Sequence, residues 1–98
     1  MLDGRYEVEM VTPMGRKQGN VVLRTEGDQL FTRIDAPIIG KQEFVCSADG
    51  DSFSGEGSFK VMLVGTVTFK GRGYVEGDDL HAILETNNGT FQIEGKRV

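Results

Sequence analysis

The dipeptide Gly-Asp, repeated along the chain, most constrains what this sequence can fold into. It occurs at 27–28, 50–51 and 77–78, each time between two segments that alternate apolar and polar residues, and Asn-Gly at 88–89 holds a similar position. Two-residue hairpin loops need positive φ angles, which Gly and Asn adopt at the lowest steric cost. The four dipeptides therefore predict four tight β-hairpins.

The apolar residues that flank these loops support the same interpretation. Residues paired across a two-residue loop share a face of the sheet and have numbers with an odd sum, so the inward face must change parity at each loop. Val21 and Leu23 precede the first loop, and Leu30 and Ile34 follow it. The same change occurs at the other three loops. Further residues with predicted inward parity are Phe53, Leu63, Leu84 and Phe91. Because a slip of one residue would turn every apolar side chain outward, this consistency favours antiparallel hairpins.

Period-two alternation extends along most of the chain. The apolar residues Tyr6, Val8 and Met10 alternate with glutamates, and no stretch of a dozen residues keeps a helical apolar period without a glycine in it. We predict strands at 5–12, 18–26, 29–36, 41–49, 52–62, 66–76, 79–86 and 90–97.

Eight antiparallel strands joined in sequence leave two exposed edges, which closure removes. The predicted fold class is therefore all-β, an eight-stranded up-and-down meander closed into a small barrel. A flattened two-sheet sandwich is the alternative. At 98 residues we expect one domain, covering 1–98, with a single modest core. A barrel of this size has room for its own side chains or for one small ligand.

Charge and composition exclude several classes of protein. The net charge is −4, and no run of Lys and Arg is longer than two residues, which argues against a nucleic-acid partner. The sequence has no apolar run long enough to predict a membrane span, and its first residues lack the pattern of a signal peptide. The single cysteine, Cys46, cannot form an internal disulfide. We therefore expect a cytoplasmic protein.

The segment Thr12-Pro13-Met14-Gly15, between the opening LDGRYEVEM and the Gly-Asp turns, carries a family resemblance. It resembles a group of small bacterial lipocalin-like β-barrel proteins, some of which are joined to flavin-dependent reductases of the old-yellow-enzyme type. The resemblance implies a lipocalin- or streptavidin-like barrel over the whole chain and small apolar ligands. It implies no catalytic residues.

Four glycines fall on the inward parity of the fifth and sixth predicted strands, namely Gly55, Gly57, Gly71 and Gly73. If Phe59 pairs with Phe69, paired numbers sum to 128 and the glycines face one another. Two interpretations follow, since glycine in a strand marks either a bend or a close approach. Either the barrel curves there and aromatic rings fold over the gap, or the wall is cleared for a flat ligand.

Two further residues face this glycine patch across the second hairpin loop. Phe44 and Cys46 have the parity to lie opposite Gly57 and Gly55, so they line the same space. The candidate ligand site is therefore Phe44, Cys46, Gly55, Gly57, Phe59, Phe69, Gly71 and Gly73.

Ile38 and Ile39 complete the list of candidate ligand residues, because two adjacent isoleucines in a connection are unusual. They have three interpretations: a plug in the barrel end, the rim of a ligand portal, or a contact surface shared with Met14.

Catalytic and metal chemistry find little support in the sequence. Cys46 would need a base to act as a nucleophile, yet the only histidine, His81, has outward parity beside Tyr74. No Cys or His spacing suits a metal, and the aspartates lie at separate turns. We therefore predict an inert Cys46 thiol, no catalytic residues, no metal and no cofactor.

The sequence thus predicts a non-enzymatic barrel that binds a small apolar or aromatic molecule. The alternative is a structural or interaction module with a filled core, which forms homo-oligomers or serves as an accessory of a flavin reductase. Outward apolar residues would provide the contact surface, and they are Val22, Phe31, Val45, Met62 and Ile83.

Overall fold

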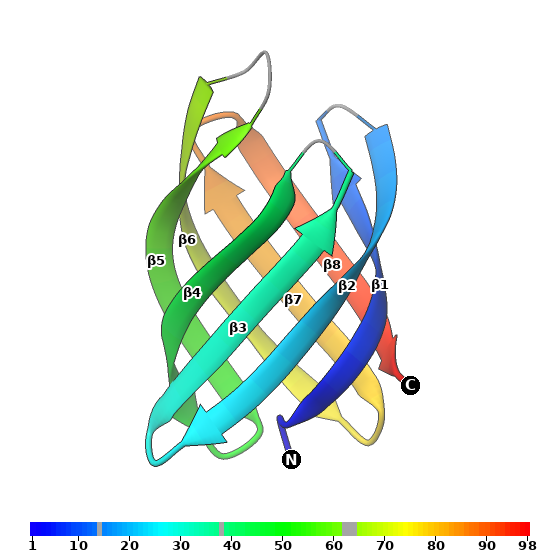
Figure 1. The fold of residues 1–98 in the computed structure, drawn as a ribbon, viewed down its shortest axis with the longest axis vertical. Coiled ribbons are helices and arrows are strands. Elements are labelled where there is room, and N and C mark those ends of the chain that lie inside the picture. The colour runs from blue at the N-terminus through cyan, green and yellow to red at the C-terminus, as the bar shows by residue number, and fades with distance from the viewer. Residues whose placement is uncertain (14, 38, 62–64) are drawn as a thin grey trace.

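The computed structural model describes residues 1–13, 15–37, 39–61 and 65–98 and shows an all-β protein (Figure 1). Its strands are β1 (Gly4–Thr12), β2 (Gly15–Glu26), β3 (Gln29–Ala36), β4 (Gly40–Asp49), β5 (Ser52–Val61), β6 (Gly65–Glu76), β7 (Asp79–Thr86) and β8 (Gly89–Arg97). Each strand is antiparallel to the next, and β8 pairs with β1. The predicted closed meander is confirmed, and the two-sheet sandwich is not the fold. Within the described residues, no helix is long and apolar enough to span a membrane.

Three of the four predicted hairpin loops have the expected position. Gly27, Gly50 and Gly77 have φ angles of 61°, 63° and 62°, the left-handed conformation that glycine adopts without steric cost. The fourth loop was predicted one residue too late: Thr86 pairs with Gly89, so the loop is 87–88. The Thr86 hydroxyl explains the shift, because it accepts a bond from the backbone N–H of Asn88 at 3.0 Å and donates to the Gly89 carbonyl.

The predicted register between β5 and β6 was wrong by two residues. Phe59 pairs with Val67 rather than with Phe69, so paired numbers sum to 126. The inward face is unchanged, since a shift of two residues preserves parity. The observed register places Gly57 opposite Phe69, so a large ring lies against a position without a side chain. The difference between the predicted and observed registers comes from side-chain volume, which parity does not take into account.

The inward side chains form one core along the barrel axis. Most residues with predicted inward parity are buried, although Phe44 and Phe53 are only partly buried and Leu63 lies outside the described residues. Among the described residues, the buried apolar side chains are Leu2, Tyr6, Val8, Met10, Val21, Leu23, Leu30, Ile34, Ala36, Ile39, Phe59, Val61, Val67, Phe69, Val75, Leu80, Ala82, Leu84, Phe91 and Ile93.

The N-terminal segment covers the end of the barrel that carries the Gly-Asp loops (Figure 1). Leu2 is only 1% exposed, and its carbonyl accepts a hydrogen bond from the Tyr6 hydroxyl at 2.8 Å. Asp3 accepts hydrogen bonds from the backbone N–H and the hydroxyl of Thr25. Arg97 donates to the Tyr6 hydroxyl at 2.7 Å. These bonds hold an irregular segment against the core. The period-two pattern does not predict this contact.

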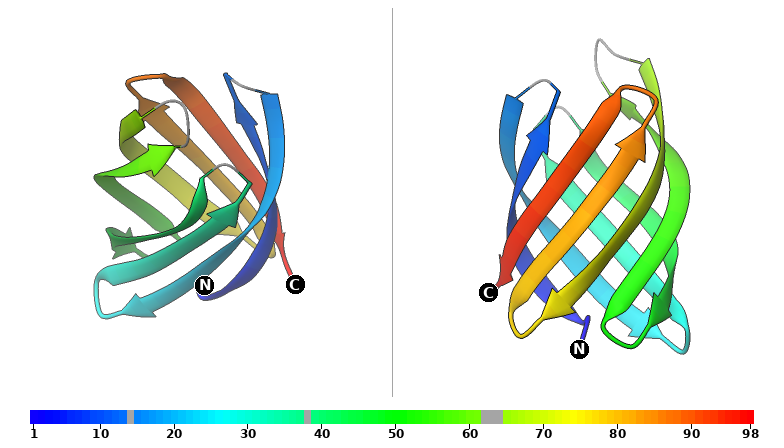
Figure 2. Two further views of the ribbon diagram at one scale, coloured as in Figure 1. Left: turned by 45° about the horizontal axis from the view of Figure 1, so that its top comes forward. Right: turned by 180° about the vertical axis from the view of Figure 1, so that it is seen from behind.

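One pair of neighbouring strands is joined over a much shorter length than the others. β4 and β5 pair at Ser47–Ser54, Ala48–Phe53 and Asp49–Ser52, next to their hairpin loop. No further pair joins the two strands, both of which lie within the described residues. A wedge opens between them toward the opposite end of the barrel (Figure 2, left). We call this region, between 40–46 and 55–61, the β4–β5 seam.

Candidate functional site

A cavity of about 40 Å³ lies in the barrel interior beside the β4–β5 seam. Only apolar atoms of the described residues border it, including the side chains of Phe44, Phe53, Phe69, Leu80, Leu84 and Ile93. Seven strands, β2 to β8, contribute described residues to the wall, because the inward residues of a small barrel converge on its axis. The cavity is far smaller than the roughly 300–1,000 Å³ of an ordinary ligand pocket.

The inward glycines do not leave a bare wall, because neighbouring side chains cover them. A Cβ atom placed on Gly57 would lie 3.2 Å from Cζ of Phe69, and one placed on Gly73 would lie 2.5 Å from Cζ of Phe53. A Cβ on Gly71 would lie 2.5 Å from Cδ2 of Leu84. Side chains of Phe69, Phe53 and Leu84 thus lie over these three glycines.

The rings that cover this region form an aromatic cluster. Phe44 meets Phe69 edge to face, with centroids 4.8 Å apart, and meets Phe59 in the same way at 6.1 Å. Phe59 and Phe69 lie 5.8 Å apart, and Phe59 continues the cluster to Phe91 at 6.5 Å. Such separations are typical of favourable aromatic pairs. The side of the interior formed by β4, β5 and β6 is therefore aromatic.

Cys46 borders the cavity as a half-buried thiol. Burial raises the pKa of this thiol above its ordinary value of 9.0, and a weaker opposing contribution comes from the Thr32 hydroxyl, 3.9 Å from Sγ. Thiolates, rather than thiols, are the reactive form, so a raised pKa lowers reactivity near neutral pH. The interpretation of Cys46 as an inert wall residue agrees with this environment.

The structure brings some of the candidate ligand residues together and separates others. Phe44, Cys46, Gly55, Phe69 and Gly71 border the cavity. Gly57 and Phe59 lie beside it in contact with the rings. Gly73 is covered by Phe53 and Ala82. Ile39 is buried where β3 turns into β4, and Ile38 lies outside the described residues.

Sequence reasoning left Phe53 and Thr32 out of the candidate site. Phe53 pairs with Gly73 and borders the cavity, and Thr32 pairs with Phe44 in the middle of β3. The parity of Phe53 marked it as inward, so the missing information was the β5–β6 register. With paired numbers summing to 126, Phe53 would have been placed over Gly73.

The only histidine lies on the outer face of the barrel. The rings of His81 and Tyr74 are stacked with centroids 4.9 Å apart, which confirms their predicted outward positions. His81 Nδ1 also contacts the Glu94 carboxylate. Cys46 faces the interior, so His81 and Cys46 lie on opposite faces of the sheet. Within the described ranges, no group of three or more His, Cys, Asp or Glu residues is placed to hold a metal ion.

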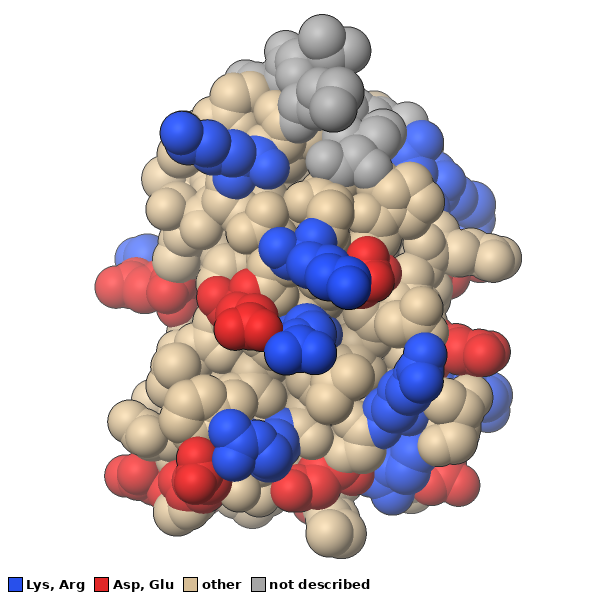
Figure 3. Space-filling view, viewed as in Figure 1, with Lys and Arg blue, Asp and Glu red and all other residues tan. Residues whose placement is uncertain are grey.

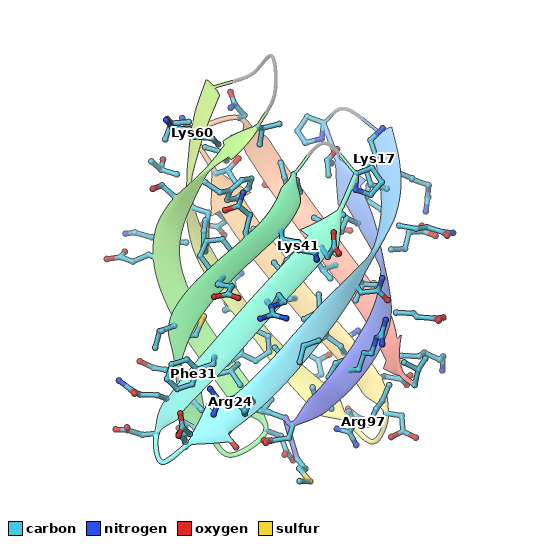
Figure 4. All side chains as sticks on the ribbon, viewed as in Figure 1. Lys17, Arg24, Phe31, Lys41, Lys60 and Arg97 are labelled. Atoms are coloured by element: carbon cyan, nitrogen blue, oxygen red, sulfur yellow. The ribbon has the colours of Figure 1, made fainter. Side chains whose placement is uncertain are left out.

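The outer face of β2, β3 and β4 carries an apolar patch formed by Val22, Phe31 and Val45. Val22 is 40% exposed and Val45 is 53% exposed. The guanidinium of Arg24 lies over the Phe31 ring, 4.7 Å from its centroid, and both side chains project from the outside of the barrel (Figure 4). Met62 lies outside the described residues, and Ile83 is half-buried on β7.

Charged side chains of both signs are interspersed over the face of the barrel seen in Figure 3. Arg33 and Glu43 form one such pair at 2.9 Å on neighbouring strands.

Comparison with known protein families, with curated proteins and with solved structures found no match for this chain.

Proposed function

We propose that this barrel is a non-catalytic binding protein for a small apolar or aromatic molecule held in its interior. The observation that carries the proposal is the cavity between Phe44, Cys46, Phe69 and Leu84, whose border is wholly apolar. An apolar group gains free energy there by leaving water, whereas a charged or hydrogen-bonding group would lose its hydration without compensation. The expected ligand therefore presents an apolar group to the interior.

The size of the cavity limits the ligand further. A cavity of roughly 150 Å³ lined by comparable side chains takes benzene, whereas this cavity measures about 40 Å³. A ligand therefore displaces a side chain when it enters. The partly buried rings of Phe44 and Phe53 are the candidates, because they pack against the core without being enclosed by it.

The test is a titration of the protein with toluene, followed through methyl resonances of inward residues. We expect shifts confined to methyl groups that border the cavity, such as those of Leu80, Leu84 and Ile93. Filling the cavity with Ala82→Leu should abolish these shifts. Ala48→Leu is the matched control, because Ala48 packs against the core but does not border the cavity. Toluene shifts that are absent, or that survive Ala82→Leu in a folded protein, would overturn the proposal.

A second candidate function rests on the outer patch of Val22, Phe31 and Val45. Exposed apolar patches on small proteins mark contact surfaces, so the chain would associate with itself or with a partner such as a flavin reductase. Sedimentation velocity tests self-association: a dimer that Val45→Glu converts to a monomer supports it. A monomer at all concentrations removes self-association from consideration.

A further inference from the structure

The β4–β5 seam is the part of the wall next to the cavity that lacks ladder pairs. Beyond the Ser47–Ser54 pair, no ladder pair of the described strands joins β4 to β5, although β4 stays paired with β3 and β5 with β6 along their lengths. Backbone groups that lack a sheet partner exchange bonds with water and separate at low free energy. The seam is therefore the part of the wall that opens most easily.

Phe44 lies on this unpaired stretch of β4 and borders the cavity. On the β3 side, Phe44 pairs with Thr32, but on the β5 side it has no ladder partner among the described residues. Its ring extends toward β5, where a Cβ atom on Gly57 would lie 3.5 Å from Cδ1 of Phe44. Gly57 presents no side chain to the ring, so the contact from β5 comes from the Phe59 ring, with centroids 6.1 Å apart. Phe44 borders both the interior cavity and the outer surface beside Phe31 and Val45.

The place that the Phe44 ring vacates is already shaped for an aromatic ring. Its position is bounded by the Phe69 ring at 4.8 Å and the Phe59 ring at 6.1 Å, both edge to face. We propose that ligands enter through the β4–β5 seam, that Phe44 is the gate, and that a single aromatic ring of the ligand takes the place of the Phe44 ring. This inference rests on the proposed function and adds the entrance and the ligand class.

A ring in this position would be recognised by its edge and faces. Edge-to-face pairs contribute about 0.5–1.5 kcal/mol beyond burial of the same area, so an aromatic ring should bind better than a saturated ring of equal size. Polar substituents on the ligand would point toward the seam, because the interior offers them no partner.

Cys46 supplies a reporter for the gate, because it is the only cysteine and borders the cavity beside the seam. We expect Phe44→Ala to speed alkylation of Cys46 by iodoacetamide about tenfold or more, since opening exposes the thiol. Phe44→Leu, which keeps an apolar side chain, should give a smaller acceleration. It also preserves the test if Phe44→Ala does not fold.

Two matched variants separate gating from general loosening. Phe31→Ala removes a ring from the outer face of neighbouring β3 and should leave the alkylation rate unchanged. Phe91→Leu loosens the same aromatic cluster away from the seam, and urea unfolding calibrates its loss of stability. If both Phe44 variants alkylate no faster than Phe91→Leu at equal stability, Phe44 is not the gate.

The ligand class is tested with toluene and methylcyclohexane, which share a carbon skeleton. Toluene should slow the alkylation of Cys46 in the wild-type protein, and methylcyclohexane should do so at least about threefold less effectively. Equal protection would overturn ring recognition while leaving the binding function intact.

If neither probe protects Cys46 or shifts the inward methyl groups, the proposed function itself is wrong. Protection by toluene without any effect of the Phe44 variants would leave binding intact and refute the seam as the entrance.

Discussion

The β1–β8 contact and the β4–β5 contact close the same barrel in opposite ways. β1 and β8 come from opposite ends of the chain and are joined by six pairs, from Tyr6–Arg97 to Val11–Gln92. β4 and β5 are joined by a two-residue loop and pair over only three positions. Loop closure favours local pairing, so chain entropy alone would give the reverse order. The difference shows that side chains, rather than sequence distance, decide where this wall is continuous.

Glycine has a different neighbour at each contact. At β1–β8, Gly95 lies opposite Val8, and a Cβ atom there would lie 2.5 Å from Val8 Cγ1 and 2.8 Å from the Glu7 carbonyl oxygen. The missing side chain lets the two strands approach. At β4–β5, the ring of Phe44 takes the space beside Gly57. Gly95 therefore allows a close approach of β1 and β8, whereas Gly57 leaves room for the rings of Phe69 and Phe44.

Hydrogen exchange should show the largest difference between the two contacts. Alternate amides of 40–46 that face the seam should exchange nearly without protection. Those that join β1 to β8 should exchange only through global unfolding, which requires about 5–15 kcal/mol in a domain of this kind. Amide-resolved exchange by NMR measures both sets. Equal protection of the two sets would refute the open seam.

Tyr6→Ala should be the most destabilising single substitution at the β1–β8 contact. Tyr6 is 0% exposed, and its hydroxyl bonds both Leu2 and Arg97. Truncation of a buried aromatic side chain costs about 3–5 kcal/mol, whereas truncation of half-buried Phe44 should cost roughly 1–2 kcal/mol. Urea unfolding measures both, with Tyr6→Phe as the control that removes only the hydroxyl. A Phe44→Ala loss equal to that of Tyr6→Ala would contradict the comparison.

The same substitution at two glycines sharpens the contrast at a smaller scale. Gly95→Ala places a methyl group against the backbone of β1, which cannot move aside, and should cost about 1–3 kcal/mol. Gly57→Ala places it 3.2 Å from the end of the Phe69 ring, which can shift, and should cost less than about 1 kcal/mol. Thermal unfolding of the two variants side by side measures the difference. The reverse order would show that the seam is packed as tightly as the β1–β8 contact.

The smallest effect concerns pH and the N-terminal segment that adjoins β1. The Thr25 hydroxyl, followed by its backbone N–H, lowers the pKa of Asp3 below the ordinary 3.8. A carboxylate of this kind stabilises the fold at pH values above its unfolded pKa, and this contribution is lost as the pH falls through the lower folded pKa. Asp3→Asn should therefore be slightly less stable at neutral pH and lose less stability below about pH 4. Urea midpoints between pH 2 and pH 6 test this, and parallel curves for the two proteins would contradict it.

Periodicity and turn chemistry predicted most of the fold, because both act between residues close in the chain. Alternation placed Leu23, Leu84 and Phe91 in the core, where they are buried. Gly27, Gly50 and Gly77 marked three loops through their need for positive φ. Parity, however, cannot distinguish registers that differ by two residues, so it misplaced Phe69 relative to Gly57. Parity therefore placed the four glycines on the inward face, but it assigned the rings that cover them to the wrong partners.

The sequence by itself determined which side chains face inward and where the chain reverses, since each depends on one residue and its immediate neighbours. Only the tertiary structure decided which residues of β8 and β1 pair, that Leu2 is buried at one end, and that β4 and β5 separate beside Phe44. The physical reason is volume: close packing balances the rings of Phe44, Phe53 and Phe69 against the missing side chains of glycine across several strands at once. The cavity is the space that this balance leaves.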